Sequence, residues 1–257
     1  MKQSYLWILL FSTSIIFSYT IKDQFDPIGY SEFLKPFIKT GDLVFDIGAH
    51  QGKKAASLTS LGARVVCFEP QPHLQRYLKN RFNNNDHILL EPLAIGEKEG
   101  VLPFYQCDAD TLSTFSREWI EQSRFSDGSC GSFKWDTVIQ VPIATLDHMI
   151  QKHGTPVFCK IDVENFEYEV LKGLSYPIQL ISFEYACETE HNSRNCLERL
   201  QKLGYTKFNF VIAESTEFVS SVWLSASELL TTLQDLRSQQ LPKIGNLLWG
   251  DIYAYYE

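Results

Sequence analysis

Four acidic residues stand where predicted strands end, and there their carboxylates could bind hydroxyl groups or accept protons. They are Asp46, Glu69, Asp162 and Glu184, and Glu164 follows just beyond the third of them. Ligands of an open α/β sheet bind at the carboxyl ends of its parallel strands, so these side chains are expected to share one edge. Carboxylates in that place suit a nucleoside ribose on one side and removal of a hydroxyl proton on the other.

The first of these acids opens a glycine-rich turn. An apolar strand carries Asp46 near its end, and Gly48 and Gly52 follow it. Glycine permits both a sharp turn and a close approach of the backbone to a ligand. A helical pattern over 54–61 then completes a strand, turn and helix. Glu69 ends the next strand about 20 residues beyond Gly48, at the distance expected of an acid that accepts hydrogen bonds from a ribose.

The glycine spacing separates two classes of ligand. A dinucleotide site requires G-x-G-x-x-G, and this chain has His50 and Lys53 where that pattern needs glycine. The spacing D-x-G-x-x-x-G instead resembles the first motif of class I S-adenosylmethionine-dependent methyltransferases, and an NAD-dependent enzyme is the alternative that it disfavours. We therefore predict that S-adenosyl-L-methionine lies against Asp46, Gly48, Ala49, His50, Gly52, Glu69, Pro70 and Ala94.

Alternating strand and helix patterns position these residues. They predict a doubly wound, Rossmann-like α/β sheet with helices on both faces. Strands are expected at 43–47, 63–69, 87–91, 101–106, 138–143, 157–162, 180–185, 208–213 and 251–255. Helices are expected at 30–38, 54–61, 72–82, 163–174 and 196–203, and another is expected to begin after Thr145 as its N-cap.

Composition fits one globular domain over residues 22–257. The 257 residues are 44% hydrophobic, and the net charge of −8 disfavours a nucleic-acid partner. Residues 107–136 form a polar insertion whose aromatic side chains either line a substrate pocket or pack the loop down. Cys107 and Cys130 bracket it and could pair in an oxidising compartment, although no C-x-x-C pattern occurs and reduced thiols are expected.

Residues 1–21 differ from the rest of the chain. Lys2 precedes an apolar run over 5–21 that resembles a signal peptide and reaches the short limit of a membrane span. Export would separate the enzyme from the compartment that makes its methyl donor, so we favour membrane association through an uncleaved anchor. Secretion after cleavage near residue 18 and an additional N-terminal helix are the alternatives.

The longest motif runs from Lys160 to Leu174 and reads K-I-D-V-E-N-F-E-Y-E-V-L-K-G-L. It resembles the signature K-I-D-V-E-G-x-E-x-x-V-L-x-G of the FkbM family of methyltransferases. Further motifs follow in the order of that family: Asp46-Ile47-Gly48-Ala49-His50, Phe68-Glu69-Pro70, Ala94-Ile95-Gly96, Thr111-Leu112-Ser113, Thr145-Leu146-Asp147 and Phe183-Glu184. The resemblance covers roughly residues 40 to 255. It implies the class I fold, S-adenosylmethionine as donor, and hydroxyl acceptors on polyketides, sugars or related metabolites.

One position departs from the signature. Asn165 replaces a glycine, and asparagine readily adopts the left-handed backbone that glycine permits. The turn is therefore expected to survive, with added bulk beside the pocket. A non-catalytic cofactor-binding or interaction protein on the same fold is the alternative that this change leaves open.

The acceptor side is expected at the later strands. We predict Asp162, Glu164 and Glu184 there as catalytic groups, with His191, in the loop after the Glu184 strand, as a further candidate base. Asp162 and Glu164 could instead only stabilise a helix N-terminus, and His191 could be a solvated loop histidine. No metal is expected, because three good ligands are not evident. The predicted partner is a small-molecule or glycan methyl acceptor, and the oligomeric state is left open.

Overall fold

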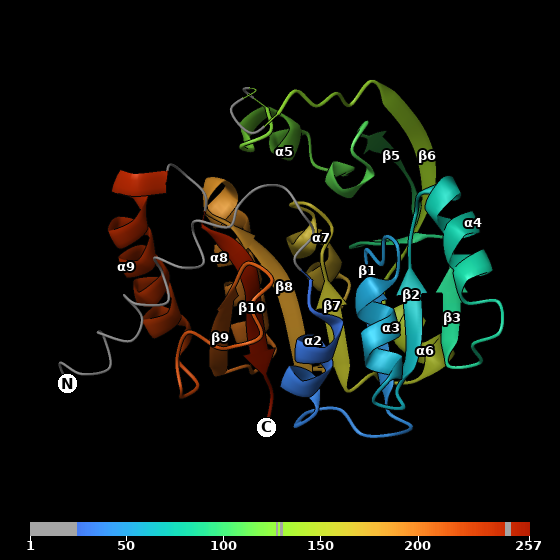
Figure 1. Ribbon diagram of the computed structural model, residues 1–257, viewed down its shortest axis with the longest axis horizontal. Helices are drawn as coiled ribbons and strands as arrows, with labels where there is room; N and C mark the ends of the chain where they lie inside the picture. The colour runs from blue at the N-terminus through green and yellow to red at the C-terminus, as the bar shows by residue number, and fades with distance from the viewer. Residues whose placement is uncertain (1–24, 127, 129–130, 245–247) are drawn as a thin grey trace.

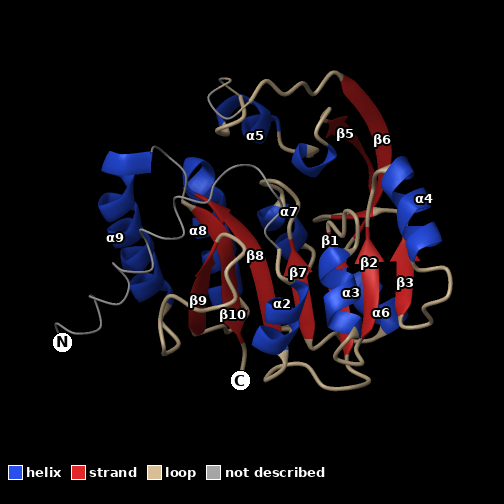
Figure 2. Ribbon diagram, in the orientation of Figure 1, coloured by secondary structure: helices blue, strands red, loops and turns tan. Residues whose placement is uncertain are grey.

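A mostly parallel sheet runs through the centre of the protein (Figures 1 and 2). The structure is a computed structural model that describes residues 25–126, 128, 131–244 and 248–257. Within these residues the strand order is β3-β2-β1-β7-β8-β10-β9, and β10 is antiparallel to both of its neighbours. The strands are β1 Leu43–Ile47, β2 Arg64–Phe68, β3 Ile88–Glu91, β7 Phe158–Ile161, β8 Leu180–Ala186, β9 Lys207–Ile212 and β10 Trp249–Tyr255.

The order of the strands sets the place of a ligand. The chain moves outward from β1 through β2 to β3 and later returns to β7, on the other side of β1. The carboxyl ends of β1 and β7 therefore form the topological switch point at which such sheets bind ligands. Every residue of β1 is buried, as expected of a parallel strand covered on both faces.

Helices cover both faces, as predicted. One buried apolar cluster joins α2, α3 and α4 to one face of the sheet, and another joins α6, α7, α8 and α9 to the opposite face. Their bounds are α2 Pro27–Leu34, α3 Lys53–Thr59, α4 Pro72–Arg81, α6 Leu146–His153, α7 Glu167–Lys172, α8 Glu190–Lys202 and α9 Ala226–Ile244. The expected N-cap at Thr145 is confirmed, because its side chain accepts a hydrogen bond from the His148 amide at 3.1 Å.

A second, small sheet stands beside the first. It has the order β4-β6-β5, with β4 Ala94–Ile95, β5 Gly100–Gln106 and β6 Thr137–Ala144. The insertion between β5 and β6 carries the 3-10 helix η2 Asp110–Leu112 and the helix α5 Arg117–Gln122. It passes over the carboxyl ends of the parallel strands, at the top of Figure 1. The sequence predicted β5 and β6 as strands but did not separate them from the main sheet.

Five helices differ from the prediction. α2 covers Pro27–Leu34 instead of 30–38, and α5 was not predicted. α7 begins at Glu167 rather than at 163, because Glu164 and Asn165 have left-handed backbones with φ of 54° and 70°. α8 begins at Glu190, well before the predicted 196, and it follows the short 3-10 helix η3 Cys187–Thr189. α9 was not predicted from the sequence at all.

Some predictions fall on residues that the structure does not describe. The N-terminal segment 1–21 and Cys130 both lie outside the described ranges. The thiol of Cys107 is free and buried. Among the helices that the structure describes, none combines the length and the apolar character needed to cross a membrane.

Candidate active site

The glycine turn brings the backbones of two strand ends into contact. Gly48 has a φ of 77°, and a Cβ atom on it would lie 1.8 Å from the Asp162 carbonyl oxygen, so that only glycine fits. The amides of Gly48 and Ala49 both donate to the Phe68 carbonyl, at 3.0 and 3.1 Å. The turn after β1 is thereby held against the ends of both β2 and β7.

Glu69 lies beside this turn at the end of β2. Its side chain is buried, and its two carboxylate oxygens accept hydrogen bonds from the amides of His50 and Gln71, each at 2.8 Å. Burial raises the pKa of Glu69 to about 7, although these two hydrogen bonds oppose the rise. Each oxygen has a second lone pair, so the carboxylate can still accept hydrogen bonds from ribose hydroxyls.

Asp46 is buried beneath the turn. Its carboxylate lies 3.6 Å from the ammonium of Lys160, which also lies 3.0 Å from Asp162. These two carboxylates neutralise the buried ammonium of Lys160. Burial nevertheless raises the pKa of Asp46, and its oxygens have no hydrogen-bond partner among the described residues.

These features fit the nucleoside half of S-adenosylmethionine. Gly48 lets the turn pack against the end of β7, and a buried carboxylate with spare lone pairs stands at the end of β2 beside it. The remaining predicted cofactor residues differ in their placement. The His50 amide is already bonded to Glu69, Pro70 follows that acid, and Ala94 begins β4 of the second sheet.

The predicted acceptor acids come together at the ends of β7 and β8. One carboxylate oxygen from each of Asp162, Glu164 and Glu184 lies within 4.8 Å of the others. The reason for expecting no metal was therefore wrong, because three carboxyl groups do converge among the described residues. Such acidic groups are also common without an ion, and the three carboxyls can share protons instead.

The three acids differ in their electrostatic surroundings. Burial disfavours ionisation of Asp162, but the ammonium groups of Lys160 and Lys54 outweigh it and lower its pKa. Burial and the neighbouring carboxylates raise the pKa of Glu164 and of Glu184 well above its usual range. At neutral pH the cluster therefore combines one ionised carboxylate with carboxyls that readily hold a proton.

A buried acid shapes the bend that carries Glu164. One carboxylate oxygen of Glu167 accepts hydrogen bonds from the amides of Val163 at 3.2 Å and Asn165 at 3.1 Å, and the other accepts from the Asn192 side chain at 2.6 Å. These bonds hold the two left-handed residues, including Asn165, as the replacement of glycine by asparagine predicted. Burial raises the pKa of Glu167 to about 7.

The insertion contacts this bend from above. The Thr114 hydroxyl donates to the Glu164 carbonyl at 2.6 Å, and the Asn165 amide group donates to the Ser116 hydroxyl at 3.0 Å. Farther along, Arg124 donates two hydrogen bonds to the carboxylate of Glu188, at 2.5 and 2.7 Å, and both side chains are buried. Segment 114–124 thus covers the acceptor acids.

The aromatic side chains of the insertion pack against their surroundings. Phe115 contacts Phe166 with ring centroids 4.9 Å apart, and Trp119 contacts Phe125 at 6.1 Å. The indole of Trp135 donates to the Leu112 carbonyl at 2.8 Å. Of the two interpretations of these aromatics, the structure shows the one in which they pack the loop down.

The sequence predicted that His191 lies in a loop. In the structure it lies in α8, which begins one residue before it. Its ring pairs with Glu118 of α5 at 2.9 Å, and its side chain is 54% exposed. Glu118 also lies 3.4 Å from the Asn165 amide nitrogen, so His191 stands at the rim of the acceptor side. Its role as a base stays a prediction.

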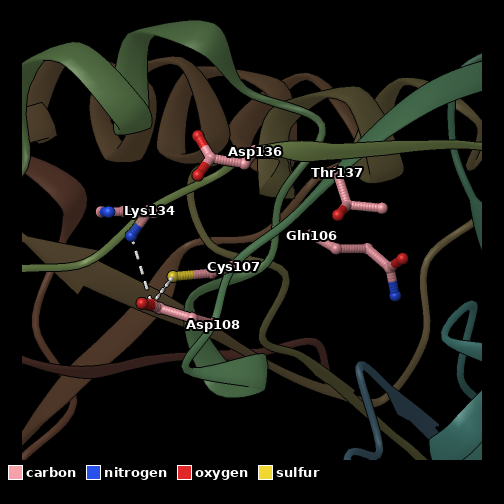
Figure 3. A pocket seen from close by; sticks show the side chains of 6 residues that line it. All are labelled: Gln106, Cys107, Asp108, Lys134, Asp136 and Thr137. Carbon is pink, nitrogen blue, oxygen red and sulfur yellow. Dashed lines mark hydrogen bonds between the residues drawn. The ribbon is translucent and has the colours of Figure 1, made fainter.

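A cavity of about 300 Å³ opens elsewhere, between the adjoining ends of β5 and β6 (Figure 3). Its lining residues are Gln106, Cys107, Asp108, Lys134, Asp136 and Thr137. The Cys107 thiol and the Lys134 amide both donate hydrogen bonds to Asp108 there. None of the predicted site residues lines this cavity, so we do not assign it to the active site.

Several residues of the site were not predicted from the sequence. Glu167 belongs to the quoted signature, but its hydrogen bonds become visible only when the bend is folded. Asp110 adjoins the motif Thr111-Leu112-Ser113, and its carboxylate meets His50 and His73. Only the proximity of that motif could have pointed to Asp110, because those partners are far apart in the chain.

The fold and the two groups of acids define a Rossmann-like, class I S-adenosylmethionine-dependent methyltransferase. A model of the Methyltransferase FkbM domain matches residues 46–238, most of the chain. This protein belongs to the FkbM methyltransferase family, and its cofactor is S-adenosyl-L-methionine. A search among curated proteins finds no match.

Several solved structures resemble this chain at low sequence identity. Precorrin-6y C5,15-methyltransferase from Geobacter metallireducens is 11% identical, with 93% of this chain and 92% of that chain covered and a TM-score of 0.46. An rRNA methylase from Streptococcus thermophilus is 12% identical, with 92% and 100% covered and a TM-score of 0.44. Aeropyrum pernix fibrillarin, with natively bound S-adenosyl-L-methionine, is 12% identical, with 89% and 76% covered and a TM-score of 0.42. These values are too low to indicate a substrate.

Proposed function

We propose that this methyltransferase transfers the methyl group to a hydroxyl oxygen of a small molecule or glycan. The observation that carries the proposal is the convergence of Asp162, Glu164 and Glu184 beside the cofactor end of the sheet. An alcohol is a weak nucleophile until its proton is removed, and a carboxylate within hydrogen-bond reach can remove it.

The three acids have different roles because their electrostatic surroundings differ. Asp162 is held ionised by Lys160 and Lys54, so it orients the acceptor by accepting a hydrogen bond. Glu164 and Glu184 have raised pKa values, and whichever of them is ionised is a stronger base than an ordinary carboxylate. Carboxyl groups that can both accept and donate hydrogen bonds suit neutral polyhydroxyl acceptors.

Bound S-adenosylmethionine supplies an electrophilic methyl group on a sulfonium that leaves as a neutral thioether. The acceptor oxygen forms the new bond to that methyl carbon as the carbon–sulfur bond breaks, and its proton passes to a glutamate carboxylate. Glu69 and the glycine turn fix the nucleoside, so that the acceptor acids can align the oxygen opposite the departing sulfur. Segment 114–124 lies against this region through its hydrogen bonds to the bend.

The test is a screen of small-molecule alcohols and glycans with methyl-labelled S-adenosylmethionine. We expect a methyl ether product, stable to mild alkali, and a loss of roughly 100-fold or more in rate for Glu164→Gln or Glu184→Gln, with cofactor affinity retained. Glu169→Gln serves as the control, because Glu169 pairs with Lys172 on the outer side of α7. Methyl transfer to nitrogen or carbon, or full activity in both glutamine variants, would contradict the proposal. Tight cofactor binding without turnover on any acceptor would favour the non-catalytic alternative.

A further inference from the structure

Asp110 connects the insertion to the cofactor end of the sheet. Its carboxylate oxygens meet the Nε2 atoms of two histidines, His50 at 2.9 Å and His73 at 3.2 Å. His50 belongs to the glycine turn after β1, and His73 belongs to the first turn of α4. The Asp110 carbonyl also accepts a hydrogen bond from the Gln71 side chain at 3.0 Å. One residue of η2 therefore contacts two segments beside the strand ends, the glycine turn after β1 and the start of α4.

Two of these partners are the same residues that hold Glu69. The backbone amides of His50 and Gln71 donate to the two oxygens of the Glu69 carboxylate, at 2.8 Å each. Asp110 contacts the side chains of those two residues, that of His50 through its carboxylate and that of Gln71 through its backbone carbonyl. Its contacts thus restrict both donors that orient the ribose-binding acid.

The Gln71 side chain is also fixed from the insertion. It accepts a hydrogen bond from the Ser113 hydroxyl at 3.2 Å, and that hydroxyl in turn accepts from the Cys107 amide at 3.0 Å. Gln71 and Ser113 are buried, whereas the side chains of Asp110 and His73 are 35% and 45% exposed. A partly exposed aspartate does not need two histidine partners in order to be solvated, so its contacts are better explained by what they position.

We propose that Asp110 is a positioning residue of the nucleoside site: through His50 and Gln71 it orients Glu69 toward the ribose hydroxyls of the cofactor. This inference rests on the proposed function, because it requires S-adenosylmethionine in the site. η2 then forms one side of the cofactor site. The insertion contacts the site of the methyl donor through Asp110 and the site of the methyl acceptor through segment 114–124.

The experiment compares two nucleoside probes by equilibrium binding to the full chain. 5′-Methylthioadenosine carries the ribose hydroxyls, and its 2′,3′-dideoxy form lacks them. The ratio of their Kd values measures recognition of the hydroxyls, and a general loosening of the protein would leave this ratio unchanged. We expect the ratio to fall roughly three- to tenfold in Asp110→Asn, the range for a partly exposed charged contact.

Asp108→Asn is the matched control. Asp108 lies in the same insertion and accepts hydrogen bonds from the Ala109 and Lys134 amides, but it does not contact His50 or Gln71 in the structure. We expect its Kd ratio to stay within twofold of the wild-type value, whatever its melting temperature. An unchanged ratio in Asp110→Asn, or an equal fall in Asp108→Asn, overturns the inference. If the wild-type protein binds neither S-adenosylhomocysteine nor 5′-methylthioadenosine, the proposed function fails first and the role of Asp110 fails with it.

Discussion

Glu69 makes cofactor binding depend on pH near neutrality. Its pKa is about 7 because of burial, with nearby carboxylates such as Asp110 and Asp46 adding to the rise and the two amide hydrogen bonds opposing it. Ribose hydroxyls that donate to the carboxylate stabilise its ionised form, so binding lowers this pKa and releases a proton below pH 7. The affinity therefore increases as the pH rises through 7 and is constant above it.

We expect S-adenosylhomocysteine to bind roughly tenfold more weakly at pH 6 than at pH 8. Calorimetric titrations at several pH values, in two buffers of different ionisation enthalpy, measure both the affinity and the proton release. Glu69→Gln cannot titrate, and its weaker binding should lose this pH dependence. A slope that persists in Glu69→Gln would assign the titration to another group, such as Glu164 or Glu184, and would refute this account of Glu69.

The positions of single residues were predicted correctly where a residue stands at the end of a regular strand. Acids at the ends of parallel strands must share an edge, so the meeting of Asp162 with Glu184 followed from the pattern. The pairing of Asp110 with His50 and His73 did not follow, because it depends on the path of an irregular insertion. The same reason explains His191, whose place changed when α8 began earlier than its apolar pattern suggested.

At the scale of elements, the bend between β7 and α7 depends on one buried carboxylate. A left-handed backbone costs roughly 1 to 3 kcal/mol at a residue such as Glu164 and less at Asn165, and Glu167 compensates this cost through its hydrogen bonds to the Val163 and Asn165 amides. Glu167→Ala leaves the amides of Val163 and Asn165 without that acceptor, and we expect it to lower the free energy of unfolding by about 3 kcal/mol.

Urea denaturation of three variants measures this effect. Glu167→Gln keeps an oxygen for the two amides, and rotation of the Asn192 side chain lets its own oxygen accept from the new amide, so we expect a loss of only about 1 kcal/mol. Glu169→Ala on the same helix breaks a half-exposed pair with Lys172 and should cost less than about 0.5 kcal/mol. Equal losses in Glu167→Ala and Glu169→Ala would show that Glu167 does not hold the bend.

This bend also shows where sequence patterns fail. The apolar spacing over 163–174 is helical, and it correctly gave the helix and its end near Gly173. It could not show that the first turn is replaced by left-handed residues, although Asn165 in a glycine position was a sign of it. The separate small sheet of β4, β5 and β6 was not predicted for a related reason. The spacing of strands along the chain does not show which strands pair.

At the scale of the whole molecule, Lys54 joins parts that are distant in the chain. Its ammonium lies 3.5 Å from Glu214, 3.7 Å from Asp251 and 4.0 Å from Asp162, and 5.9 Å from the centre of the Tyr30 ring. Asp162, Asp251 and Glu214 come from the β7 side of the topological switch point and Tyr30 comes from α2, whereas Lys54 itself lies in α3 after β1. Lys54 is largely buried, and its loss would leave three neighbouring carboxylates without a shared cation.

We expect Lys54→Met to lower the free energy of unfolding by about 3 kcal/mol at pH 7, the cost of removing one partner from a buried charge network. The pKa of Asp162 is lowered in the folded protein, so its contribution is present above the pKa of the unfolded chain and is lost as the pH falls through the folded value. The deficit of Lys54→Met should therefore be constant between pH 5 and 8 and shrink below about pH 4.

Denaturant titrations across this range test the prediction, with Lys35→Met as the control, since Lys35 is exposed and pairs with Glu32 on the surface of the protein. A deficit that stays unchanged as the acids become protonated would mean that Lys54 stabilises the molecule through its packing rather than through its charge.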